Sequence, residues 1–150
     1  MIQRIQTLFL LEIAFLCISL MFIPVQYIVS GGTDIAIKLV PVSNELFHSS
    51  PGHFAAVGIN IFTLIITFIT IFMFKKRELQ IKLCYLIVIL FVVLISMFAF
   101  CPLVNLNETL EVKDSLFGYF ILIIGSISAF LAARYVKKDI ELLKSTDRIR

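Results

Sequence analysis

Few side chains in this chain have the types and spacing that site chemistry requires. Glu12 is a carboxylate inside an apolar run, an arrangement that a proton or cation site could use. His48 and His53 share a loop with carboxylates and could bind zinc or copper, but their spacing does not force them onto one ion. We therefore expect a solvated loop around the two histidines and no metal site.

The 3 cysteines offer neither a redox motif nor a disulfide framework, because no Cys-x-x-Cys pair occurs among Cys17, Cys84 and Cys101. Cys84 and Cys101 lie near opposite ends of the same apolar run. They are roughly 25 Å apart along a helix, so they cannot form a disulfide bond with each other. No glycine-rich phosphate loop, Ser/His/Asp set or His-Glu-x-x-His motif occurs either. We expect a protein that is not an enzyme and binds no cofactor.

The composition excludes an ordinary water-soluble domain. The 150 residues are 60% hydrophobic and 15% charged, with a mean hydropathy of +1.04, whereas soluble domains are about 45–50% apolar and about 25% charged. The net charge of +3 is too small to indicate a nucleic-acid partner. The partner that this composition predicts is the lipid bilayer.

Four apolar runs approach the about 20 residues that a membrane-spanning helix needs. They are too long and too continuously apolar for barrel strands. The first run could continue past Pro24 to Val29, and because no Ala-x-Ala site follows it, we expect an anchor and not a cleaved signal peptide. The sequence predicts an all-α integral membrane bundle of four transmembrane helices, a single domain over 1–150. The predicted spans are 7–23, 54–74, 83–104 and 116–133.

The distribution of Lys and Arg predicts the orientation, since short cytoplasmic loops are rich in both. All but two of the 13 basic residues lie before the first run, in the 75–82 loop or after Ala133. Lys38 and Lys113 lie in the other two loops, which are net acidic. We therefore expect both termini in the cytoplasm and the longest loop, 24–53, outside.

The 24–53 loop is too short to build a core of its own. Gly31-Gly32 is a turn signal, and the alternating residues 34–40 could form a short strand. We expect this loop to lie over the outer ends of the helices.

Small and polar residues recur at helical spacing in two of the runs, as at contacts between membrane helices. In the second run they share one helix face, and in the fourth they form a small-xxx-small seam that predicts a close crossing. We expect both sets to pack the bundle, although the first could also line a substrate path. The packing residues are Ala56, Asn60, Thr63, Thr67 and Thr70, and Gly118, Gly125, Ala129 and Ala133.

Glu12 is the only charged residue within the four predicted runs. It lies roughly 7–8 Å beyond Thr7 along a helix, a shallow depth that lowers the cost of a carboxylate. One hypothesis is a proton or cation site. The other, which we favour, is a carboxylate that snorkels, is protonated, or pairs with Arg134 or Lys82 in the cytoplasmic layer.

The tail, 134–150, keeps helical spacing, with Val136, Ile140 and Leu143 on one face. We expect the fourth helix to run on into the cytoplasm or to bend along the membrane surface. The basic residues of the tail could anchor it to lipid headgroups or form a docking peptide for a protein.

The two ends of the chain resemble a known family of small four-helix membrane proteins of Bacteroidetes bacteria, catalogued as domain of unknown function 4293. The residues that carry the resemblance are MIQRIQT at 1–7 and STDRIR at 145–150. The resemblance covers the whole chain in length and span order. It implies an inner-membrane location with both motifs on the cytoplasmic face, and no activity. Glu12 departs from the family's pattern.

These observations favour a non-enzymatic scaffold or accessory subunit of the bacterial inner membrane, which contacts a larger protein of unknown identity through its cytoplasmic termini. The alternative is a small dimeric proton-coupled transporter that uses Glu12, so a homo-oligomer is compatible with the sequence. The expected partner surface comprises Gln3, Arg4, Gln6, Asp147, Arg148 and Arg150.

Overall fold

The computed structural model describes residues 2–30, 33–39, 51–73, 76–100 and 111–147. Four helices dominate it: α1 (Ile2–Phe22), α2 (Pro51–Phe72), α3 (Arg77–Phe100) and α4 (Leu116–Asp147). Each is long and apolar enough to cross a membrane. This result confirms the prediction of four apolar helices.

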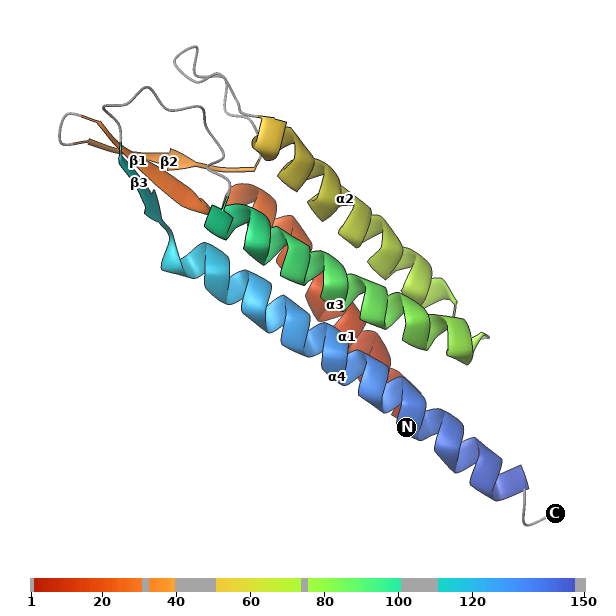
Figure 1. The fold of residues 1–150 in the computed structure, drawn as a ribbon. Coiled ribbons are helices and arrows are strands. Elements are labelled where there is room, and N and C mark those ends of the chain that lie inside the picture. The colour runs from red at the N-terminus through yellow and green to blue at the C-terminus, as the bar shows by residue number, and fades with distance from the viewer. Residues whose placement is uncertain (1, 31–32, 40–50, 74–75, 101–110, 148–150) are drawn as a thin grey trace.

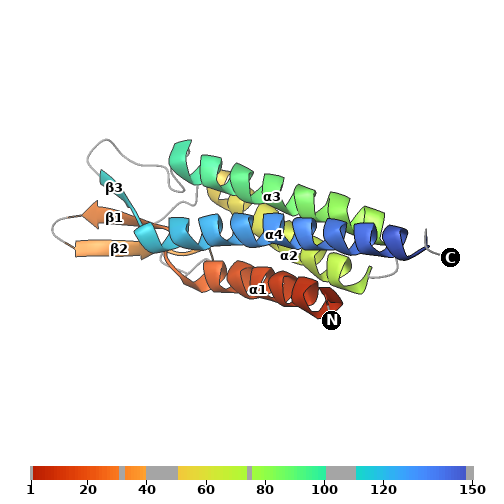
Figure 2. The same cartoon turned by 90° about the horizontal axis from the view of Figure 1, so that it is seen from below.

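The helices form an antiparallel bundle in which each helix packs against two neighbours (Figure 1, Figure 2). α1 contacts α2 and α4, and α3 contacts the same two helices from the other side. Leu10 and Ile13 from α1 and Phe91 and Phe98 from α3 are among the largest fully buried side chains. Many large apolar side chains, such as Phe15, instead face outward, as expected where the surroundings are lipid.

The helix ends differ from the predicted run ends because polar residues can continue a helix beyond the apolar segment. α1 already begins at Ile2, and α3 begins at Arg77 with Glu78 in its first turn, where a carboxylate interacts favourably with the helix dipole. α1 ends at Phe22 and does not continue to Val29, because Pro24 lacks the amide hydrogen that a helix needs. Of the third run, residues 101–104 lie outside the described residues.

A three-stranded antiparallel sheet caps one end of the bundle, with the strand order β2-β1-β3. β1 (Gln26–Ser30) follows α1, β2 (Thr33–Ile37) returns along it, and β3 (Glu111–Asp114) precedes α4. The strand predicted within 34–40 therefore exists as β2, whereas its two partner strands were not predicted. We call this the sheet end of the bundle.

Two hydrogen bonds fasten the sheet to the helices. The Ser115 amide donates to the Val25 carbonyl at 2.9 Å, which joins the start of β1 to the start of α4. Gln26 Nε2 donates to the Phe98 carbonyl at 3.1 Å and reaches α3. The part of the 24–53 loop that the structure describes thus lies over helix ends, as expected of this loop.

Both chain termini lie at the opposite end of the bundle, which we call the terminal end (Figure 1). α4 has 32 residues, whereas α1 has 21 and α3 has 24. It therefore extends beyond the other helices at the terminal end (Figure 2). α4 continues as one helix to Asp147, so the helical spacing predicted for the tail is confirmed up to that residue.

Candidate functional site

The polar stripe of α2 is buried, and its hydroxyl groups are already bonded. Each threonine hydroxyl donates to a carbonyl of the preceding turn of the same helix: Thr63 to Ile59, Thr67 to Thr63 and Thr70 to Ile66, at 2.7–2.8 Å. Such bonds satisfy the hydroxyl within its own helix. Together with the buried Ala56, these residues form a packed surface of α2 whose threonine hydroxyls donate to their own helix.

Asn60 is the member of the stripe that bonds to another helix. Its Nδ2 donates to the Cys17 carbonyl of α1 at 3.0 Å, and Gln80 Nε2 of α3 donates to the Thr70 carbonyl at 3.4 Å near the other end of α2. Polar bonds of this kind stabilise contacts between membrane helices by about 0.6–2 kcal/mol. Asn60 Oδ1 is buried and has no hydrogen-bond partner in the described part of the chain, which reduces the net gain.

The small residues of α4 lie where other segments approach it most closely. Gly118, Gly125, Ala129 and Ala133 are all buried. A Cβ atom on Gly125 would stand 2.7 Å from Cζ of Phe91, and one on Gly118 would stand 3.0 Å from Cα of Val25. The seam thus accommodates an aromatic ring of α3 and the backbone that follows α1.

Glu12 lies on the outer face of α1, away from the bundle. Leu10 and Ile13 form the buried face, and Glu12 is exposed between the exposed side chains of Leu8 and Phe15. The predicted pairing with Arg134 or Lys82 is wrong, since within the described residues Glu12 makes no ion pair with either. The reason is rotation, because a position two residues after Leu10 points about 200° away from it.

Glu12 lies within the apolar part of α1. By length and composition, the candidate membrane span of this helix is Ile5–Phe22. A carboxylate that faces lipid within a span is costly. Its exposure leaves it available to a second membrane-embedded protein.

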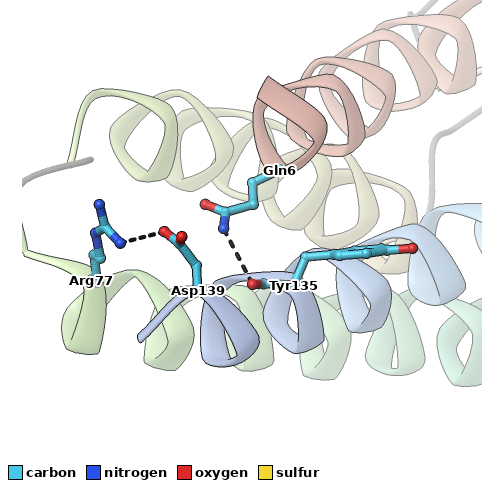
Figure 3. A network of polar contacts seen from close by, with 4 residues as sticks. All are labelled: Gln6, Arg77, Tyr135 and Asp139. Atoms are coloured by element: carbon cyan, nitrogen blue, oxygen red, sulfur yellow. Dashed lines mark hydrogen bonds and ion pairs between the residues drawn. The ribbon is translucent and has the colours of Figure 1, made fainter. Parts of the chain in front are cut away.

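A cluster of polar and aromatic contacts fastens the terminal end of the bundle, and Figure 3 shows its polar part. Arg77 at the start of α3 forms an ion pair with Asp139 of α4. Gln6 Nε2 of α1 donates to the Tyr135 carbonyl of α4 at 3.2 Å, and the rings of Phe9 and Tyr135 stack with centroids 5.5 Å apart. Contacts from two helices therefore hold α4 at the point where it leaves the bundle.

The contacts of Gln6 in this cluster show that its predicted place on the partner surface is wrong. Gln6 is only 5% exposed, and it joins α1 to α4 instead of facing a partner. Gln3 and Arg4 lie in the first turn of α1 and Asp147 ends α4, while Arg148 and Arg150 lie outside the described residues. The ion pair of Arg77 was missed because the two residues stand 62 positions apart in sequence.

A groove between α3 and α4 opens beside this cluster. Its volume is about 550 Å³, and basic residues dominate the polar part of its wall. In the sequence these residues indicate only the orientation of the helices, because nothing in their spacing reveals that they line a groove with a residue of α3. They are Arg134, Lys137 and Lys138, with Tyr85, Phe130 and Glu141 completing the lining.

The other residues considered for chemistry are dispersed. His53 is buried near the start of α2 and contacts the ring of Phe54, so it is not part of a solvated loop. Cys17 and Cys84 are buried free thiols, and His48 and Cys101 lie outside the described residues. Among the residues that the structure describes, no group of three or more His, Cys, Asp or Glu side chains could hold a metal ion.

A family model matches almost the whole chain. The model described as Domain of unknown function (DUF4293) matches residues 2–149. The chain belongs to the DUF4293 family. No curated protein and no solved structure is detectably similar to this DUF4293 chain. The resemblance to this family is thereby confirmed, and the function of this DUF4293 protein must be argued from its own geometry.

Proposed function

We propose that this protein is a non-enzymatic scaffold or accessory subunit of a bacterial inner membrane, which contacts a larger protein through the terminal end of its bundle. The observation that carries the proposal is the extension of α4. About 20 residues suffice to cross the hydrocarbon core, whereas α4 has 32. The charged residues of α4 all follow Ala133, so we infer that the turns after it leave the hydrocarbon core and project as a helix.

A projecting helix needs contacts to remain folded, because short isolated helices are marginally stable in water. The base of the extension has such contacts in the ion pair of Asp139 and the stacked ring of Tyr135. Beyond them, Glu141 and Leu142 are exposed, and Leu142 is 44% exposed. An exposed apolar side chain on a rigidly held helix is a typical docking feature for another protein.

The closed interior also supports a scaffold. A transporter uses a polar cavity near the middle of the membrane, formed by broken helices. The four helices here are continuous over their described lengths, and the threonine hydroxyls of α2 bond to their own helix. The bundle core is thus built for packing.

The second candidate is a small dimeric proton-coupled transporter that uses Glu12. One observation favours it: the carboxylate faces outward, where a second copy of the chain could cover it. A dimer of this kind would place Glu12 at its interface, and polar groups there would exclude lipid from the carboxylate.

The test is purification of the tagged full-length chain from its native membrane in mild detergent, with the native mass measured. A scaffold should elute with a stoichiometric larger partner. Deletion of residues 145–150 and, separately, Leu142→Glu should each remove most of that partner while alkaline extraction still finds the chain in the membrane. Leu79→Glu is the matched control, because Leu79 is similarly exposed at the terminal end but lies on α3.

Three results would contradict the scaffold. If recovery of the partner is unchanged after both changes, the α4 extension does not contact the partner. Equal loss in the Leu79→Glu control would show a general effect of charge at this end. A homodimer with no larger partner would instead support the transporter.

A further inference from the structure

We propose that the groove between α3 and α4 binds the headgroup of an anionic glycerophospholipid. Arg134, Lys137, Lys138 and Glu141 line it from α4 and Tyr85 lines it from α3, around a volume of about 550 Å³. This inference goes beyond the contact with a protein partner and does not depend on it. Its ligand is a lipid, and its residues lie at the base of the α4 extension.

The spacing of the charged lining residues places them on one side of α4. Lys137 and Lys138 each lie three or four residues from both Arg134 and Glu141, so the four share one face of the helix. That helix is fixed next to the groove by the ion pair of Asp139 with Arg77 and by the contacts of Tyr135. The helix that carries the cations is therefore fixed in position before any ligand arrives, which lowers part of the entropic cost of binding.

The charge of the groove fits an anion. Arg134, Lys137 and Lys138 make no ion pair with any described carboxylate, whereas Arg77 already has its partner. With Glu141 as the one acidic residue of the lining, three positive charges stand against one negative charge. Phosphate oxygens accept hydrogen bonds from guanidinium and ammonium groups, so a phosphodiester is the ligand chemistry that this arrangement recognises.

The position of the groove identifies the phosphate as part of a lipid. Arg134 is the first charged residue of α4 and directly follows the buried Ala133. Tyr85 and Phe130 are about half exposed on the same wall, as aromatic side chains are at the boundary between hydrocarbon and headgroups. The groove thus offers an apolar side to acyl chains and a cationic side to phosphate, which basic pockets between membrane helices provide for lipid headgroups.

Glu141 restricts the headgroup further. Besides its phosphate, the ligand must present to Glu141 a group that donates a hydrogen bond, because an ionised carboxylate only accepts. The glycerol hydroxyls of phosphatidylglycerol can donate in this way, and its single phosphodiester charge matches the excess of cations. We therefore expect phosphatidylglycerol to bind more tightly than phosphatidylcholine, which has no such donor and no net charge.

The test measures binding of a fluorescent phosphatidylglycerol to the purified full-length chain in phosphatidylcholine nanodiscs. The double variant Lys137→Gln, Lys138→Gln removes two of the three cations that line the groove and should bind at least tenfold more weakly. The control variant Lys76→Gln, Lys82→Gln removes the same charge from exposed positions at the terminal end that do not line the groove, and it should change affinity less than about twofold.

A second variant keeps the proposal testable if the double variant does not fold. Glu141→Gln removes the ionised acceptor of an exposed side chain and should weaken phosphatidylglycerol binding, because the glycerol hydroxyls lose their charged acceptor. Equal losses in the groove variant and the control variant would overturn the proposal, since they would show surface attraction only. Displacement of the lipid by millimolar inorganic phosphate would overturn the lipid as the source of the phosphate, and unchanged binding in both Lys137/Lys138 and Glu141 variants would overturn the site.

Discussion

A carboxylate on the outer face of a membrane helix gains little from its own chain, and Glu12 is such a residue. Its apolar neighbours Leu8 and Phe15 are exposed with it, and within the described residues no cation pairs with it. On insertion scales an acidic side chain at the centre of a membrane helix costs about 2.5–3.5 kcal/mol. Any benefit of Glu12 must therefore come from outside the single chain.

We expect Glu12→Gln to leave the thermal unfolding midpoint of the detergent-solubilised monomer unchanged or slightly raised. The combination with Arg134→Gln should be additive, because the two side chains do not interact. The matched cycle is Arg77→Gln with Asp139→Asn, whose ion pair predicts a coupling of about 0.5–1 kcal/mol at this partly exposed site. A coupling between Glu12 and Arg134 as large as in the matched cycle would contradict the outward position of Glu12.

Gln6 shows what spacing cannot predict at the level of a residue. It lies near the start of α1, where both solvent and a neighbouring helix are within reach of a long polar side chain. Gln6 is buried because Tyr135 of α4 lies next to it. Whether the two residues meet depends on how far α1 and α4 extend at this end of the bundle. For a residue in the middle of a run, such as Thr67, the face of the helix on which it lies is sufficient to predict its burial.

The existence of the four helices could be predicted because the bilayer requires long apolar runs. The sheet could not be predicted in the same way. β1 lies in the continuation of the first apolar run after Pro24, and β3 is only four residues long. Their pairing joins Gln26 to Asp114, and a contact so distant in sequence has no local signal.

The contact between α3 and α4 gives a prediction at the level of an element. Gly125→Ala should destabilise the bundle by about 1–3 kcal/mol, the usual cost of overpacking a core, because the new methyl group would overlap the ring of Phe91. Gly58→Ala is the control: a Cβ there meets nothing within 4 Å, so the higher helix propensity of alanine should leave stability unchanged or raise it by up to about 1 kcal/mol.

The measurement is the thermal unfolding midpoint of each variant in the same detergent. Phe91→Leu should recover part of the loss in the Gly125→Ala background, since a smaller side chain vacates the overlap, while it destabilises the wild-type chain. Equal effects of Gly125→Ala and Gly58→Ala would refute the close crossing of α3 and α4.

In the whole molecule, most basic residues lie at the same end of the bundle as the two termini. The structure brings both termini to one end of the bundle (Figure 1), and the basic residues of the 75–82 loop and of α4 belong to that end. Lys38 and Lys113 belong to the sheet end, where acidic residues outnumber them. If basic segments stay in the cytoplasm, the terminal end is cytoplasmic, and the groove faces the inner leaflet.

Cysteine labelling of intact spheroplasts tests this orientation. In a Cys101→Ser background, Cys17 and Cys84 are buried and should not react. A membrane-impermeant maleimide should label Lys38→Cys, at an exposed position of the sheet end, before lysis, and Ser145→Cys near the end of α4 only after lysis. The reverse pattern would place the α4 extension outside, where a cytoplasmic partner could not reach it, and would assign the groove to the outer leaflet.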